Sequence, residues 1–169
     1  MGEAGILDHD DNVELLGGEI VQKAVIGPRH AAVVTRAHDA LVAELGNSAT
    51  VRVQSPVALD DLWEPEPDLA VCVRRNDYYA TGHPRPSDVL LLVEVADSSL
   101  RRDRARKVAR YGAAGVPEVW LIDLSAETLE VYQEPGSDGY ESRTTHGPGE
   151  TLTPVRLPDV SVETATFLA

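Results

Sequence analysis

The sequence contains little of several kinds of residue, and each shortage excludes a class of protein. A single cysteine, Cys72, cannot form an internal disulfide or a cysteine-rich zinc site, in agreement with a reducing compartment. No apolar run approaches the roughly 20 residues of a membrane span, and the start of the chain lacks the basic and apolar regions of a signal peptide. We therefore expect a soluble, cytoplasmic protein without membrane contact.

Positive charge is scarce and unevenly distributed. The 169 residues carry 15 basic and 28 acidic side chains, a net charge of −13, which is the wrong sign for a protein that coats nucleic acid non-specifically. Six of the basic residues nevertheless fall in the segment 101–110, together with one acid. An anion site is expected in this segment, although the same pattern is typical of a solvated helix face.

Hydrophobic periodicity predicts one α+β domain over residues 13–169, preceded by a flexible segment 1–12. Helical spacing predicts helices over about 28–45, opened by Pro28, and over about 100–113, with Ser99 as the N-cap. Period-two patterns and turn residues predict a mixed sheet and a hairpin over 13–22. Further strands are expected over 51–59, 68–73, 89–96, 118–123 and 128–133, with edge strands in the tail. No glycine-rich phosphate loop follows a strand, which argues against a dinucleotide or P-loop fold.

Glu94 is the one charged residue in the apolar run 89–96, which is typical of a central strand covered on both faces. An ionised and unpaired carboxylate there costs several kcal/mol of desolvation, so a cation must partner it or it must be protonated. The chain has only two lysines, and one of them, Lys107, lies on the helix that follows this strand. A metal ion is the other candidate partner. The alternative to a functional site is a structural ion pair that takes no part in catalysis.

Asp68 follows Pro67, which cannot donate to a β-ladder and therefore belongs at the beginning of its strand. If this strand neighbours that of Glu94, the two carboxylates and a backbone carbonyl such as that of Val95 supply the hard oxygen ligands that Mg²⁺ or Mn²⁺ prefers. Such an ion activates water and neutralises a phosphodiester, while Lys107 positions the water or stabilises the developing charge. Taken alone, Asp68 is more often a turn or strand-initiating acid.

The order of an acid, a second acid and a lysine on strand, strand and helix resembles the PD-(D/E)XK nuclease superfamily. More narrowly, the chain from about Glu14 onward resembles the Uma family of putative restriction endonucleases in the segments 64–70, 82–84, 92–100, 103–107 and 114–123. The resemblance implies a restriction-endonuclease-like fold, a divalent metal held by Asp68 and Glu94, and hydrolysis of nucleic-acid phosphodiesters. One departure is Ala96, which stands where the superfamily's simplest pattern has its lysine, so that Lys107 resembles a lysine relocated to the following helix.

Three supporting residues are expected near the cleft, and the resemblance favours two of them, Glu19 and His30. Glu19 would be a third acid on the metal side, and His30 would contact a phosphate or a water. Asp103 would orient Lys107 through an i,i+4 pair instead of binding metal. An exposed hairpin carboxylate and a histidine at a helix start are at least as common explanations for Glu19 and His30.

Three functions remain open on these grounds. The first is a metal-dependent endonuclease, with DNA as the expected nucleic acid and a symmetric homodimer as the commonest assembly. The second is a nuclease-fold binding or regulatory module without turnover, which Ala96 and the net charge of −13 favour. The third is a hydrolase of a small phosphorylated metabolite, because an acidic protein repels a polyanion but admits a compact one.

Overall fold

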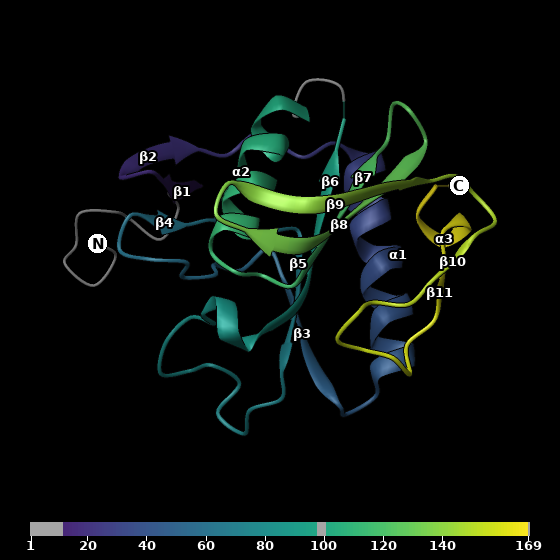
Figure 1. Ribbon diagram of the computed structural model, residues 1–169, viewed down its shortest axis with the longest axis horizontal. Helices are drawn as coiled ribbons and strands as arrows, with labels where there is room; N and C mark the ends of the chain where they lie inside the picture. Colours follow the sequence, from purple (N-terminus) through teal and green to yellow (C-terminus); the bar gives the residue numbers. More distant parts are fainter. Residues whose placement is uncertain (1–11, 98–100, 169) are drawn as a thin grey trace.

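A six-stranded mixed sheet forms the centre of the molecule (Figure 1). The computed structural model describes residues 12–97 and 101–168, with the backbone alone for residues 101–103. Only β6 and β7 are parallel, and α2 supplies the crossover between them, whereas the other neighbours are antiparallel. The strands lie in the order β3 (Ala49–Val53), β5 (Leu69–Val73), β6 (Val89–Ala96), β7 (Glu118–Asp123), β8 (Thr128–Gly136) and β9 (Gly139–His146).

Two helices cover opposite faces of this sheet, α1 (Pro28–Leu45) and α2 (Arg101–Ala113) (Figure 1). The apolar stripe of α1 packs on alternate residues of β5 to β8, and the stripe of α2 packs on the residues between them. Proline at the first helical position starts α1, and Gly46, with a positive φ of 52°, ends it. The sheet is therefore buried on both faces, which accounts for the nearly uninterrupted apolar sequence of β6.

A second, three-stranded sheet lies beside α2 (Figure 1). It consists of β1 (Val13–Leu16), β2 (Glu19–Gln22) and β4 (Trp63–Glu64) in the order β2-β1-β4. The guanidinium groups of Arg106 and Arg110 on α2 both lie 5.5 Å from the ring centroid of Trp63. These cation–π contacts join the small sheet to the helix and so bring β1 to the inner side of α2.

The C-terminal segment packs against the α1 face of the central sheet. It contains the strand pair β10 (Thr151–Leu152) and β11 (Val162–Glu163) and the one-turn helix α3 (Ala165–Leu168). The ring of Phe167 meets the buried Trp120 edge-on at 6.1 Å. A short 3₁₀ turn, η1 (Pro86–Asp88), precedes β6 on the other side of the molecule. No helix of the described residues is long and apolar enough to cross a membrane.

The α+β class, the mixed sheet and the N-terminal hairpin are as the sequence predicts, and helix 28–45 has the predicted bounds. The strand predicted over 51–59 is wrong beyond Val53. Gln54 has a positive φ of 44°, which turns the chain out of the sheet, and the amide of Val57 donates to the carbonyl of Pro65 instead of to a strand. The alternation of apolar residues extends past Val53 because Val57 is also fully buried, although it does not belong to a strand. The flexible segment predicted over 1–12 lies, apart from residue 12, outside the described residues, as does Ser99.

Candidate active site

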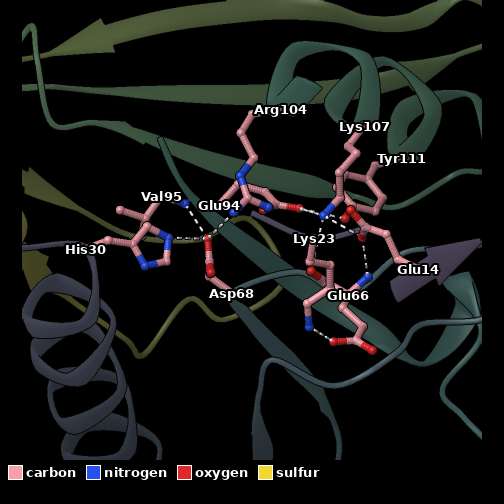
Figure 2. Close-up of polar contacts among 10 residues, drawn as sticks. All are labelled: Glu14, Lys23, His30, Glu66, Asp68, Glu94, Val95, Arg104, Lys107 and Tyr111. Atoms are coloured by element: carbon pink, nitrogen blue, oxygen red, sulfur yellow. Dashed lines mark hydrogen bonds and ion pairs between the residues drawn. The ribbon is translucent and has the colours of Figure 1, made fainter. Parts of the chain in front are cut away.

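The two strand-borne carboxylates lie together on the α2 side of the sheet. Asp68 immediately precedes β5, Glu94 lies in β6, and these two strands are antiparallel neighbours. The Asp68 side chain is 4% exposed and that of Glu94 is fully buried. One oxygen of Asp68, Oδ2, accepts the backbone N–H of Val95 at 2.8 Å, which ties it to the end of β6 beside Glu94 (Figure 2). A single guanidinium contacts both carboxylates, so they face a common space.

Three side chains from one face of α2 surround Glu94. Arg104, Lys107 and Tyr111 are spaced three and four residues apart, which places them in one row along the helix. The Nη1 of Arg104 lies 2.5 Å from Glu94 Oε2, the Nζ of Lys107 lies 3.0 Å from Oε1, and the Tyr111 hydroxyl donates to Oε1 at 2.7 Å (Figure 2). Burial and the adjacent Glu94 carboxylate together raise the pKa of Tyr111 far above its usual value, so the hydroxyl remains a donor.

The ammonium of Lys107 is buried and has three oxygen atoms as partners. Besides Glu94, it lies 3.1 Å from Glu14 Oε2 on β1 and donates to the backbone carbonyl of Glu66 at 3.1 Å. The ammonium thus takes part in two ion pairs and one hydrogen bond, and a lysine has three donors in all. The Glu66 carboxylate pairs in turn with Lys23, the other lysine of the chain. Lys107 therefore holds Glu94 in place, and it can contact a substrate only after one of these acceptors is released.

Asp68 also has a partner on α1, in addition to Arg104 on α2. His30, at the start of α1, shares a hydrogen bond with Asp68 Oδ2 through its Nε2 at 3.2 Å, and Arg104 Nη2 lies 3.3 Å from the same oxygen. Burial alone would raise the pKa of Asp68, but the His30 hydrogen bond, the Arg104 charge and the Val95 amide outweigh it and lower the pKa. The carboxylate is accordingly held ionised at neutral pH.

The cluster borders two cavities of different character. One, of about 210 Å³, is lined in part by Asp68, Arg104, Arg106 and Lys107, so it reaches the first of the two carboxylates, while Glu94 lies buried behind Arg104 and Lys107. The other, of about 510 Å³, is strongly acidic, because the carboxylates that line it outnumber its one arginine. Its charged lining residues are Glu14, Asp60, Asp61, Glu64, Glu66 and Arg85. A polyanion is therefore expected to approach the first cavity from the side of α2.

The donor set suits a small divalent cation. Magnesium is commonly held by one or two carboxylates while water and substrate phosphate complete its octahedron. Asp68 and Glu94 provide two such carboxylates, already directed at one cation, the Arg104 guanidinium. Among the side chains that the structure describes, in residues 12–97 and 104–168, no three His, Cys, Asp or Glu residues converge into a cage that would hold a metal by protein ligands alone. An ion bound here would keep several waters.

The whole chain matches a known family. The profile of the Uma2 family, described as "Putative restriction endonuclease", matches residues 4–165. The chain belongs to the Uma2 family. A solved structure of a putative nuclease of the DUF820 family from Anabaena variabilis is similar with a TM-score of 0.77 and 14% sequence identity, over 98% of this chain and 94% of that one. No curated protein matches the sequence. Membership of the family thus accounts for the nuclease-like fold.

Most of the residues singled out in this Uma2-family sequence are brought together. Asp68, Glu94, Lys107 and His30 belong to one network of contacts (Figure 2). Glu19 does not join them: it lies beside the hairpin turn, opposite Leu16, and is exposed. The side chain of Asp103 lies outside the described residues.

Sequence reasoning missed several members of the network, and two of them carried a usable signal. Arg104 and Tyr111 stand three residues before and four residues after Lys107, so helical spacing alone puts them on its face. Glu14 is the hairpin carboxylate that reaches Lys107, and it shares a strand face with the buried Leu16. Choosing Glu14 over Glu19 required knowing how the small sheet docks on α2.

Proposed function

We propose that this chain is a metal-dependent endonuclease that hydrolyses phosphodiester bonds in nucleic acid, with DNA as the expected substrate. The observation that carries the proposal is the pair of buried carboxylates, Asp68 and Glu94, that share one cation position, with the Lys107 ammonium 3.0 Å from Glu94. Membership of a family described as putative restriction endonucleases supplies the substrate class. Two carboxylates, a cation and a nearby ammonium are what stabilising a phosphodiester transition state requires.

In this proposal each residue has a separate task. A bound Mg²⁺ or Mn²⁺ would supply charge neutralisation and a more acidic water. Asp68 and Glu94 would hold the ion. His30 and the Val95 amide fix the orientation of Asp68 and keep it ionised. Lys107 keeps Glu94 in place and, once it releases Glu14 or the Glu66 carbonyl, offers a proton donor to the charge that develops on phosphate.

A binding module without turnover is the second candidate, and one observation favours it. The carboxylates of the cluster are already neutralised by side chains, because Arg104 and Lys107 both contact Glu94. Such a network is stable without metal, and the chain would then bind nucleic acid or a protein and leave it intact. The same assay separates the two candidates.

The test uses the full chain with supercoiled plasmid, linear duplex, single-stranded DNA and RNA, each with Mg²⁺, Mn²⁺ or EDTA. We expect metal-dependent cleavage by the wild type and a loss of at least about a hundredfold in Asp68→Asn and Glu94→Gln. Asp159→Asn, an exposed acid, is the matched control and should cleave like the wild type. Gel-shift binding is measured on the same samples.

Each outcome decides between the candidates. Cleavage that survives in Asp68→Asn and Glu94→Gln would assign the activity to a contaminant or another site and refute the proposal. Binding without cleavage in any metal would favour the module. Turnover of nucleotides alone would favour a small-phosphoester hydrolase. Light scattering on the same preparation tests the proposed homodimer, for which a monomer mass would be the contrary result.

A further inference from the structure

Arg104 lies in the position that a divalent cation would take. Its Nη1 is 2.5 Å from Glu94 Oε2 and its Nη2 is 3.3 Å from Asp68 Oδ2, so the guanidinium bridges the two carboxylates (Figure 2). No other described cation contacts both: Lys107 reaches Glu94, and His30 reaches Asp68. The positive charge of a cation at this point is thus supplied by the chain itself.

The guanidinium is not fully accommodated there. The Arg104 side chain is only 14% exposed, and its buried Nε has no hydrogen-bond partner among the described residues. A guanidinium has five donors, and a buried donor without a partner is unfavourable. Lys107 presents a contrast, because its one nitrogen donor group makes a hydrogen bond and two ion pairs at once. Of the two cations on this face of α2, Arg104 is therefore the one that can leave at lower cost.

The charges of the cluster favour an exchange of cations over the addition of a second one. Glu14, Glu66, Asp68 and Glu94 face the fixed positive charges of Lys23, Arg104 and Lys107. A divalent ion added beside Arg104 would place like charges within a few ångströms in a buried site, where repulsion is strong. An ion that replaces Arg104 would instead leave four negative and four positive charges.

We propose that Arg104 is a built-in counter-cation that a divalent ion must displace, so that metal binding to this site is an exchange of one cation for another. The displaced side chain has a place to go. Arg104 lines the cavity of about 210 Å³ together with Arg106, and a long flexible arginine can rotate toward its mouth. There the guanidinium would meet the phosphate of a bound polyanion, with which it can form a bidentate pair.

The exchange has a consequence for affinity. The apparent dissociation constant of the metal equals its intrinsic value divided by the fraction of time that Arg104 leaves the site free. If the guanidinium is in place for nine-tenths of the time or more, its removal tightens metal binding by about tenfold or more. A polyanion that draws Arg104 outward should also tighten metal binding, and by reciprocity the metal should tighten polyanion binding. The inference rests on the proposed function only in placing the ion between Asp68 and Glu94.

The test is calorimetric titration of the full chain with Mn²⁺ alone, without any nucleic acid. Arg104→Gln removes the bridging charge, and Arg156→Gln is the matched control, because it removes the same charge from an exposed position outside the cluster. We expect Arg104→Gln to bind Mn²⁺ at least about tenfold more tightly than the wild type, and Arg156→Gln to remain within about twofold. Equal or weaker binding by Arg104→Gln would overturn the inference.

A conservative variant protects the test against misfolding, because Arg104→Gln leaves two buried carboxylates without their shared cation. Arg104→Lys keeps one positive charge but cannot bridge two carboxylates with a planar fork. It should bind Mn²⁺ more tightly than the wild type, and its melting temperature should rise more on addition of Mn²⁺. Wild-type affinity in a folded Arg104→Lys would contradict the exchange.

The outcome is separable from that of the proposed function. Tighter Mn²⁺ binding in the Arg104 variants, together with no cleavage by any variant, would support the exchange and refute the endonuclease. Metal-dependent cleavage by the wild type, together with unchanged Mn²⁺ affinity in the Arg104 variants, would support the endonuclease and refute the exchange.

Discussion

The two lysines of the chain form a natural pair for testing how the site is held together. Lys107→Met removes the ammonium and retains an unbranched apolar stem. The Lys107 side chain is 2% exposed, and its ammonium lies 3.0 Å from Glu94 and 3.1 Å from Glu14. Its loss therefore takes one cation away from each of these two carboxylates, whose side chains are 0% and 10% exposed. Breaking a buried pair in this way costs about 3–5 kcal/mol of the free energy of unfolding.

This cost predicts a large change in melting temperature. For a chain of this length, each kcal/mol corresponds to roughly 2–4 °C, so Lys107→Met should melt about 6–20 °C below the wild type. Lys23→Met is the matched control, since Lys23 pairs with Glu66 but is 26% exposed. Ion pairs with that much solvent access contribute about 0–1 kcal/mol, which corresponds to less than about 4 °C.

Thermal and urea denaturation, followed by circular dichroism, provide the measurement. The double variant Glu14→Gln, Lys107→Met should recover part of the loss, with a coupling energy of about 0.5–3 kcal/mol, because it no longer leaves Glu14 charged and unpaired. Equal effects of Lys107→Met and Lys23→Met, or no coupling to Glu14, would refute the view that Lys107 is the buried centre of the network.

Three further predictions concern the surroundings of the site. Tyr111→Phe removes a hydroxyl that donates to Glu94 at 2.7 Å, and urea denaturation should show a loss of about 1.5–3 kcal/mol, whereas a loss below about 0.5 kcal/mol would contradict the contact. Gly112→Ala places a Cβ 2.4 Å from the carbonyl carbon of Gly139, so overpacking should cost about 1–3 kcal/mol in the same assay, and a neutral effect would mean that α2 and β9 are further apart. Burial raises the pKa of the Cys72 thiol to about 12, so it should resist alkylation until the chain unfolds, and rapid native-state labelling would contradict its burial. Because the unfolded thiol keeps a pKa near its reference value of 9.0 and loses its proton first, the free energy of unfolding should fall as the pH rises from about 9 to 12.

The elements that the sequence predicts well are those with local signals at both ends. Pro28 and Gly46 bracket α1, and the Gly17-Gly18 pair, with φ values of 66° and 81°, sets the hairpin turn. Glu94 was recognisable because a charge inside a strand that is apolar on both faces has to be explained by a partner. The strand predicted over 51–59 is too long because alternation of apolar residues indicates burial and not β-pairing. Val57 is buried but does not belong to the sheet.

The details of the site depend on tertiary geometry that no local pattern contains. Six basic residues occupy the segment 101–110, and helical spacing from Lys107 selects Arg104 and Arg110 alike, so it does not show that Arg104 is the one that bridges Asp68 and Glu94. That choice depends on how α2 crosses the ends of β5 and β6. The preference for Glu14 over Glu19 likewise depends on the contact between Trp63 and α2, which positions the small sheet.

A crystal soaked in Mn²⁺ and measured at the manganese absorption edge tests the central assignment most directly. We predict one anomalous peak within coordination distance of both Asp68 and Glu94, with water completing the shell and the Arg104 guanidinium moved away from the two carboxylates. An anomalous map without a peak between these carboxylates, and with Arg104 still bridging them at saturating Mn²⁺, would contradict a metal site at this position.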